Sequence, residues 1–288
     1  MNIIIINICI NWVYKLYEEY ILSIKKFIDK NYIDININII YYDISSFEIN
    51  LINNLDLLKY DKIFYTGDLN ILNEIVKLIN NNFKKIYFIN IEQMSHPSYY
   101  LYIRNIDKNI NIIDYSEENI PFFKSIYNTF LFPPYYEYSN NIFNKTIDIM
   151  SIINNDYRKN IINNININKN YKLLFIDNCY DKERDEYFSK TKIYINIHCS
   201  DSHNTMELIR IINLIMNKVI VITINSINSD LLYIKDYIII CNNNNDLSNL
   251  INEILNNYNY YYSKIFNNFN NEKYLLYIKQ NLDLIIYN

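Results

Sequence analysis

Apolar and polar residues alternate along the chain in two rhythms, one typical of strands and one typical of helices. Short runs rich in Ile, Val, Tyr and Phe have the length of buried strands, and longer segments repeat apolar residues at helical spacing. The runs expected to be strands are 2–10, 35–42, 62–67, 84–90, 109–114, 130–136, 146–152, 171–177, 192–198, 218–223 and 237–241. The segments expected to be helices are 14–28, 69–82, 96–105, 157–165, 182–191, 206–217, 246–269 and 272–286. This alternation predicts βαβ units, whose parallel sheets are covered by helices on both faces.

Local signals mark some of the element ends. Asp68 precedes the second expected helix in the position of an N-cap, and Pro97 stands in the first turn of the third. Pro133 and Pro134 end the sixth expected strand, and the alternation then begins again. The prolines therefore indicate a break in the chain.

The length of 288 residues fits about two domains. The best break is the segment 133–145, which predicts an N-terminal domain of residues 1–137 and a C-terminal domain of residues 138–288. We expect each to be a doubly wound, Rossmann-like α/β domain, with the two facing across a cleft. In such domains ligands bind beyond the carboxyl ends of the strands.

The composition changes how motifs should be interpreted. The chain has no Ala and a single Gly, Gly67, while Ile, Asn, Tyr and Lys dominate. These preferences are typical of an AT-rich genome. Asn adopts left-handed backbone conformations more readily than most residues, so we expect it to replace Gly in turns. The Asn runs 80–82 and 242–245 are predicted to be loops or helix ends, and a missing Gly-rich motif does not argue against phosphate binding.

Charge and cysteine content exclude several classes of function. The net charge is −4 and the basic residues are scattered, so no nucleic-acid partner is expected. The four cysteines, Cys9, Cys179, Cys199 and Cys241, lie far apart and lack the spacing of metal ligands. We expect them to be small core residues of a protein in a reducing compartment.

The N-terminal apolar stretch is too short to span a bilayer and has no basic region before it. We therefore expect an intracellular protein without an integral membrane segment.

The segment NIHCSDSHNTMELIR (196–210) gathers polar side chains between two apolar elements. It joins the end of an expected strand to the start of an expected helix, and a helix N-terminus favours anions such as phosphate. His198, Asn204 and Thr205 offer hydrogen bonds to a ligand there. Glu207 offers an acceptor for a sugar hydroxyl, and Arg210 offers either a second phosphate contact or a partner for Glu207.

The same segment also has a purely structural interpretation. Asn204 and Glu207 have the spacing of a capping box, and Glu207 and Arg210 that of an i,i+3 ion pair. His198 fits a core position as well as a site, and His203 fits a solvated loop. Two histidines with one aspartate lack a fourth metal ligand and any known ligand spacing, so no metal is expected.

Several short segments, in their order along the chain, resemble those of GT-B glycosyltransferases, in particular a divergent group found in large DNA viruses and bacteria. The resemblance extends from about residue 60 to about residue 245. The segments are FINIEQ (88–93), DYSEEN (114–119), FLFPPYY (130–136), TIDIMSIINNDYRK (146–159), KERDEYF (182–188), KIYINIH (192–198), the E-x-x-R pair Glu207 and Arg210, and KVIVIT (218–223).

This resemblance implies a function. It implies a GT-B architecture with an acceptor-side N-terminal domain and a nucleotide-sugar-binding C-terminal domain, whose last helix crosses back to the first. The implied activity is transfer of a sugar from a nucleotide-diphosphate sugar to a hydroxyl of a glycan, protein or small molecule. No metal and no further cofactor are implied. The expected location is the cytoplasm, or the host cytoplasm if the chain is viral.

The resemblance also implies roles for residues. Glu92 and His96 are the expected catalytic residues, with Glu92 preferred as the proton acceptor. The expected donor-binding residues are Arg158, Arg184, His198, Asn204, Thr205, Glu207, Arg210 and Asn213. The expected acceptor-side residues are Gln93, Asp114 and Tyr115.

Some of these residues fit structural roles equally well. Arg184 has Glu183 and Asp185 as neighbours for ion pairs, Arg158 fits the exposed start of a helix, and Glu92 fits a cap for the helix that follows. Asn213 stands where GT-B enzymes commonly have a Glu that holds the donor ribose, so a weaker hold is expected. Two other functions therefore remain open: a non-catalytic binding protein of the same two-domain form, and a nucleotide-sugar epimerase.

Overall fold

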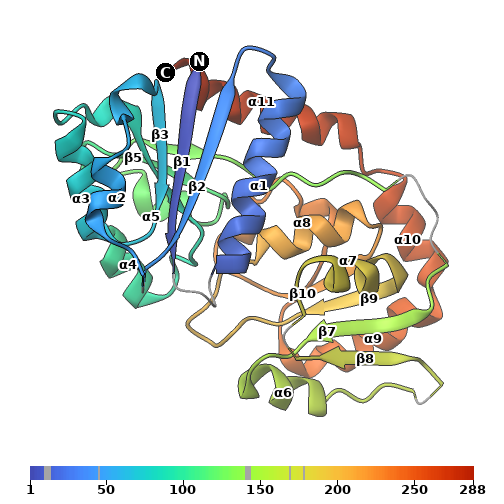
Figure 1. The fold of residues 1–288 in the computed structure, drawn as a ribbon. Helices are drawn as coiled ribbons and strands as arrows, with labels where there is room; N and C mark the ends of the chain where they lie inside the picture. Colours follow the sequence, from blue (N-terminus) through green and yellow to red (C-terminus); the bar gives the residue numbers. More distant parts are fainter. Residues whose placement is uncertain (10–13, 45, 140–143, 169, 178) are drawn as a thin grey trace. The chain divides into compact units, whose positions relative to one another are not determined.

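The computed structural model describes residues 1–9, 14–44, 46–139, 144–168, 170–177 and 179–288 (Figure 1). The chain divides into two compact units. The N-terminal unit comprises Met1–Glu92, Ser98–Tyr135 and Ile278–Asn288, and the C-terminal unit comprises Gln93–Pro97 and Tyr136–Tyr277. The short segment Gln93–Pro97 and the end of the chain therefore group with the unit that is more distant in sequence.

The N-terminal unit is built on a six-stranded parallel sheet with the order β2-β1-β3-β4-β5-β6. Its strands are β1 (Asn2–Cys9), β2 (Asn36–Asp43), β3 (Lys62–Thr66), β4 (Ile86–Asn90), β5 (Asn111–Asp114) and β6 (Thr129–Leu131). Its helices are α1 (Tyr14–Asn31), α2 (Ile49–Asn53), α3 (Leu69–Leu78), α4 (Pro97–Ile103), α5 (Ile120–Phe123) and the end of α11 (Asn271–Tyr287), with short 3-10 turns at Leu57–Lys59 and Phe83–Lys85.

The strand order of this sheet reverses between β1 and β3, because β1 has β2 on one side and β3 on the other. The described residues of β3 and β4 are all buried, as expected for central strands covered on both faces. Helix α11 packs its last turns into the same unit, where Leu282 and Ile285 are fully buried. Asp283 on this helix accepts a hydrogen bond from the Tyr32 hydroxyl at 2.5 Å.

The C-terminal unit is built on a five-stranded parallel sheet with the order β11-β10-β9-β7-β8. Its strands are β7 (Ile147–Ile152), β8 (Leu173–Ile176), β9 (Thr191–Asn196), β10 (Ile220–Ile224) and β11 (Ile239–Cys241). Its helices are α6 (Asp156–Asn163), α7 (Asp181–Lys190), α8 (Leu208–Met216), α9 (Leu247–Asn256) and α10 (Tyr258–Phe266), with 3-10 turns at Ser229–Leu231, Lys235–Tyr237 and Asn244–Asp246. Here the order reverses between β7 and β9.

The two parallel sheets confirm the predicted α/β class. The predicted N-cap at Asp68 is also confirmed, because its Oδ1 accepts from the backbone N–H groups of Asn70 and Ile71 at 2.8 and 3.3 Å. Helix α4 begins at Pro97, as predicted. Within the described ranges, no helix combines the length and the apolar character needed to cross a bilayer.

Some elements differ from the predictions. The single helix expected over 246–269 is two helices, because the backbone of Asn257 leaves the helical region with φ −122° and ψ 33°. Strand β6 ends at Leu131, before the two prolines, because proline cannot donate to the ladder. The short helices α2 and α5 were not predicted, since five and four residues are too few to show a helical period.

Asparagine takes the place of glycine in left-handed turns, as predicted. The non-glycine residues with positive φ in the described chain are Asn80, Asn81, Lys218 and Asn228. Asn80 and Asn81 follow the end of α3 with φ of 57° each. Gly67 itself has a φ of 136°, which lies outside the range that asparagine adopts easily.

Candidate functional site

Arg158 ties together the carboxyl edge of the C-terminal sheet. Its side chain is 2% exposed and belongs to the first turn of α6, which begins because the Asn155 side chain accepts from the Arg158 N–H. The guanidinium donates to the Ile197 carbonyl at 2.8 Å, to the Asn154 side chain at 2.6 Å and to Glu207 at 2.5 Å. One buried side chain thus joins the loops that follow β7 and β9, the strands between which the sheet order reverses, to the start of α8.

Glu207 is held between two arginines. Its carboxylate pairs with Arg158 and also with Arg210, so the predicted i,i+3 pair is confirmed. Burial alone would raise the pKa of Glu207, but the two guanidinium groups outweigh burial and hold the pKa at about 2. The cluster Arg158–Glu207–Arg210 therefore carries a net positive charge.

The predicted capping box is wrong. Helix α8 begins at Leu208 with Glu207 in the N-cap position, and the Glu207 side chain makes no capping hydrogen bond. The Asn204 N–H instead donates to the Ser95 hydroxyl at 2.7 Å. Glu207 cannot reach back to Asn204 because its carboxylate is held by the arginines.

His198 follows β9 and is 6% exposed. Its Nε2 lies 3.3 Å from the Asn225 carbonyl oxygen, and its buried Nδ1 has no hydrogen-bond partner among the described residues. Burial lowers the pKa of this imidazole, which favours a neutral ring that donates through Nε2 and accepts through Nδ1. An unsatisfied buried acceptor costs about 1–3 kcal/mol, so this nitrogen marks a place for a further donor.

Gln93 and Thr205 contact one another. The Gln93 Oε1 accepts from the Thr205 hydroxyl at 3.3 Å and from its N–H at 3.4 Å, and both side chains are buried. Gln93, expected on the acceptor side, therefore groups with the predicted donor residues of the C-terminal unit.

His96 and His203 form a ring pair with centroids 4.4 Å apart. His203 was predicted to be a solvated loop residue, but it is half-buried and lies 2.8 Å from the Ser200 hydroxyl through Nδ1. Burial and then the neighbouring His96 lower its pKa. His96 thus groups with the C-terminal unit, whereas Glu92 groups with the N-terminal unit.

Arg184 and Asn213 meet at Asp185. Arg184 pairs with Asp185 at 2.8 Å, as the structural alternative expected, but it is buried and lies over the Phe188 ring rather than on a solvated helix face. The Asn213 amide donates to the same Asp185 oxygen at 3.0 Å, and its carbonyl accepts from Asn217 at 2.9 Å. Asp185, to which we assigned no ligand role from the sequence, presents a carboxylate that is 51% exposed.

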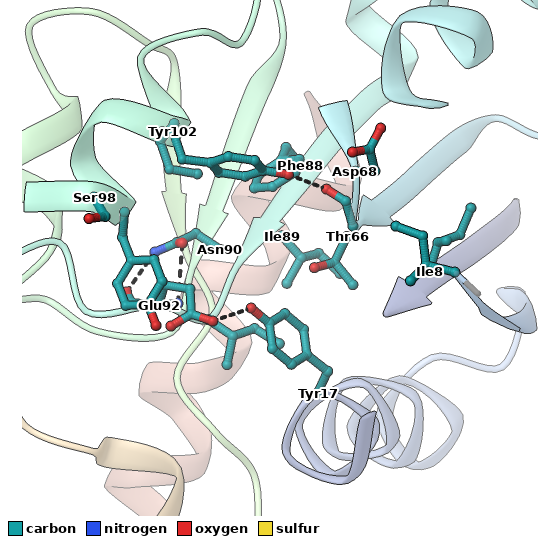
Figure 2. Close-up of a pocket in the computed structure, with 15 residues that line it drawn as sticks. Ile8, Tyr17, Thr66, Asp68, Phe88, Ile89, Asn90, Glu92, Ser98 and Tyr102 are labelled. Atoms are coloured by element: carbon teal, nitrogen blue, oxygen red, sulfur yellow. Dashed lines mark hydrogen bonds between the residues drawn. The ribbon is translucent and has the colours of Figure 1, made fainter. Parts of the chain in front are cut away.

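A pocket of about 500 Å³ lies in the N-terminal unit at the carboxyl ends of β1, β3 and β4 (Figure 2). Its lining residues are Ile8, Tyr17, Ile44, Thr66, Gly67, Asp68, Phe88, Ile89, Asn90, Ile91, Glu92, Ser98, Tyr99, Tyr102 and Ile103. Tyr17, which extends from α1, points toward Glu92 and donates to its carboxylate at 2.5 Å. The pocket therefore contains the predicted base and lies where the strand order reverses.

Gly67 permits the close approach of two strand ends at this pocket. A Cβ at this position would lie 2.3 Å from the Ile8 carbonyl oxygen, too close for any side chain. The Tyr102 hydroxyl donates to the Gly67 carbonyl at 2.7 Å and fixes the ring beside the pocket. The chain's single glycine is thus a lining residue of the pocket.

Asp114 is buried beneath the backbone of Glu92. It accepts from the side chains of Asn90 at 2.6 Å and Asn119 at 3.1 Å, and from the Ser116 N–H at 2.8 Å. The same two asparagines each donate to the Glu92 carbonyl at 3.0 Å. Burial raises the pKa of Asp114 to about 7 despite these hydrogen bonds.

Asp114 and Tyr115 were expected on the acceptor side, but neither lines the pocket. Tyr115 is 2% exposed and packs edge-on against Tyr20 in the core. Asp114 is linked to the Glu92 carbonyl by Asn90 and Asn119, which lie within the segments FINIEQ and DYSEEN but had no predicted role. Across the described part of the chain, no three His, Cys, Asp or Glu side chains gather as a metal site requires.

No protein-family model matches the chain. Two uncharacterized proteins of Acanthamoeba polyphaga mimivirus are similar in sequence. Protein R358 is 28% identical over 247 residues, which cover 77% of this chain and 78% of R358. Protein L140 is 29% identical over 178 residues, which cover 57% of this chain and 56% of L140.

Three solved structures share the fold across nearly the whole chain. An α-glucosyltransferase in complex with UDP-glucose and DNA has a TM-score of 0.60 at 13% identity, covering 99% of this chain and 100% of that one. Anabaena HepE in complex with UDP-glucose has a TM-score of 0.59 at 8% identity, covering 99% and 96%. The T4 phage protein BGT in complex with UDP and Mn²⁺ has a TM-score of 0.54 at 14% identity, covering 99% of each chain.

The chain has the GT-B fold. The fold that the sequence segments implied is thereby confirmed, as two Rossmann-like units in one chain. The relatives in mimivirus agree with the implied resemblance to proteins of large DNA viruses.

Replacing Glu207 with Gln should destabilise the C-terminal unit. The change leaves Arg158 and Arg210 close together without a counter-charge, and Arg158 is buried, a type of change that costs about 3–5 kcal/mol. We expect a lower urea midpoint in unfolding curves that are measured by circular dichroism. The matched control is Glu186→Gln, which removes an exposed pair with Lys190 and should leave the midpoint unchanged. Equal midpoints for the two variants would contradict the role given to Glu207.

Asp114 should make the protein less stable as the pH rises toward 7. Its pKa is about 7 in the folded state and near the ordinary 3.8 when unfolded, so the folded state binds the proton more tightly. The resulting stabilisation is complete below pH 3.8 and is lost as the pH rises through 7. Between pH 5 and 8, Tm should therefore fall more in the wild type than in Asp114→Asn.

The control for this experiment is Asp148→Asn. Burial would raise the pKa of Asp148, but its bonds to Lys192 and Lys172 outweigh burial and lower the pKa. Asp148 is therefore ionised in both states across this pH range, and its replacement should leave the pH dependence of Tm as in the wild type. A parallel Tm decline in Asp114→Asn and the wild type would exclude Asp114 as its source.

Proposed function

We propose that this protein is a glycosyltransferase that moves a sugar from a nucleotide-diphosphate sugar to an acceptor hydroxyl. The observation that carries the proposal is the positively charged cluster Arg158–Glu207–Arg210 at the carboxyl edge of the C-terminal sheet. In doubly wound units, ligands bind at this edge where the strand order reverses. The structural neighbours that hold UDP-glucose or UDP make a nucleotide sugar the ligand to test first.

In this proposal the diphosphate binds at the start of α8. The N–H groups of Leu208 and Arg210 at this helix start already donate to the Met206 and Glu207 carbonyl oxygens, so the attraction for an anion comes from the Arg210 side chain and the helix dipole. Arg210 is 18% exposed and contacts the diphosphate, whereas the buried Arg158 positions Glu207 and the loop after β9. His198 and the exposed side chain of Asn204 supply further polar contacts to the donor, whereas Thr205 is fully buried and positions this loop through its contacts with Gln93.

The ribose contact requires a carboxylate or amide near Asn213. Both ends of the Asn213 amide already have protein partners, Asp185 and Asn217. The exposed part of the Asp185 carboxylate is the better acceptor for ribose hydroxyls, with Asn213 and Arg184 holding it in place.

Glu92 is the proposed proton acceptor. The acceptor oxygen forms a bond to the anomeric carbon while the bond from that carbon to the diphosphate oxygen breaks. The electron pair of the broken bond leaves with the nucleotide diphosphate, and the acceptor proton passes to Glu92. His96 is paired with His203, so the base role goes to Glu92 rather than to His96.

The positive charge of Arg210 and of the start of α8 is in place before the reaction begins. It can therefore stabilise the leaving diphosphate without a cost for rearranging the site. We therefore propose that no metal is needed, although the T4 neighbour was solved with Mn²⁺. Calorimetry with and without a chelator tests this point directly.

Arg210→Ala should weaken UDP-glucose binding by roughly ten-fold or more, because a charge-assisted hydrogen bond to the diphosphate is lost. Isothermal titration calorimetry in EDTA measures the change, with Lys190→Ala as a control on an exposed helix face. Binding by Arg210→Ala as tight as that of the wild type would show that the donor site is misassigned. Absence of binding by the wild type, with UDP-glucose and GDP-sugars and with Mn²⁺ added, would remove the proposed function.

Glu92→Gln should lower turnover by a factor of about 100 or more while the Kd for UDP-glucose stays unchanged, since a general base acts on the acceptor and not on the donor. Turnover is measured as UDP released from UDP-glucose, with water or an added acceptor. Glu74→Gln, which removes an exposed pair with Lys77, is the control and should keep wild-type turnover. UDP-glucose binding without any UDP release in the wild type would favour the non-catalytic alternative.

A further inference from the structure

The pocket of the N-terminal unit has an unusual balance of charge. The lining residues that the structure describes include two carboxylates, Asp68 and Glu92, and no Lys, Arg or His. Proteins that bind a phosphate backbone neutralise it with Lys and Arg, so this lining is unsuited to a nucleic acid. This pocket therefore lacks the positive charge that a DNA substrate requires.

The two carboxylates do not call for a cation either. Asp68 caps α3 by accepting from two backbone N–H groups, and Glu92 accepts from the Tyr17 hydroxyl. Protein donors therefore already offset part of each charge. An ionised carboxylate has about four lone-pair sites, so both can still accept from hydroxyl groups of a ligand.

Aromatic rings form much of the remaining wall. Tyr17, Phe88, Tyr99 and Tyr102 line the pocket, and Figure 2 shows the Tyr102 side chain reaching across the ends of the strands. A ring face carries partial negative charge, which suits the C–H face of a pyranose. Flat rings beside carboxylate acceptors thus fit a molecule with an apolar face and a rim of hydroxyl groups.

We infer that the acceptor is a neutral sugar, such as the free end of a glycan, that stacks on Tyr102 and presents a hydroxyl to Glu92. The volume of about 500 Å³ lies within the range of small-ligand pockets. The reactive step rests on the proposed function, but the binding of the sugar does not. Its recognition depends on the rings and carboxylates of the N-terminal unit alone.

The test is saturation-transfer NMR of the full chain with the methyl glycosides of glucose, galactose, mannose and N-acetylglucosamine. We expect at least one to bind, with an affinity that does not change between about 50 and 200 mM salt. Tyr102→Leu should weaken binding about ten-fold or more, whereas Tyr102→Phe, which keeps the ring but loses its hydrogen bond to Gly67, should weaken binding clearly less than Tyr102→Leu.

Three results would overturn the inference. The first is no binding by any of the four glycosides. The second is binding of double-stranded DNA that Tyr102→Leu abolishes. The third is tighter binding of the cationic methyl glucosaminide than of methyl glucoside, which would indicate an amine acceptor.

Calorimetry with UDP-glucose on the same sample separates this inference from the proposed function. Glycoside binding without donor binding would leave the sugar site in place and remove the transferase. Donor binding and UDP release without glycoside binding would support the transferase and remove the sugar site. Circular dichroism of both Tyr102 variants checks that each remains folded.

Discussion

The ion pair between Arg158 and Glu207 is the interaction on which the ligand edge of the C-terminal unit depends. A buried guanidinium is unfavourable without a counter-charge and without acceptors for its N–H groups. Arg158 finds both, in the Glu207 carboxylate and in the acceptors of two strand-following loops. Since these partners come from three segments, the position of each segment is fixed by the same side chain.

In the proposed function, this arrangement also explains how Glu207 and Arg210 can serve both the fold and the ligand. Glu207 neutralises one arginine, and the second arginine leaves the cluster with excess positive charge near the start of α8. The Glu207 carboxylate therefore stabilises the fold, and folding places the excess positive charge before an anion binds. Electrostatic groups that are fixed before a ligand arrives are the kind that stabilise a developing charge well.

Much of the fold could be predicted because its signals are local. Strand and helix periods depend on nearby residues, as does the cap at Asp68. The break at Asn257 carries no glycine or proline signal, and an apolar period continues on both sides of it. The expected capping box at Asn204 and Glu207 failed for another reason, because its carboxylate is held by Arg158, 49 positions earlier in the chain.

The candidate site also has a part that the sequence predicts and a part that it does not. Arg158, Glu207 and Arg210 were predicted from short motifs, and the structure brings these three together. The rings of the pocket come from separate segments that share no motif, so Tyr17 and Tyr102 could not be found from spacing. The role of Asp114 depends on burial beneath Glu92, which a sequence pattern does not reveal.

Gly67 sets a steric limit on the composition of this protein. Asparagine replaces glycine where the backbone is merely left-handed, as at Asn80 and Asn228. At Gly67 the obstacle is the Ile8 carbonyl, so any larger residue would have to force the ends of β1 and β3 apart. Those ends form part of the pocket wall, so the single glycine of the chain stands where a side chain would change the shape of the pocket.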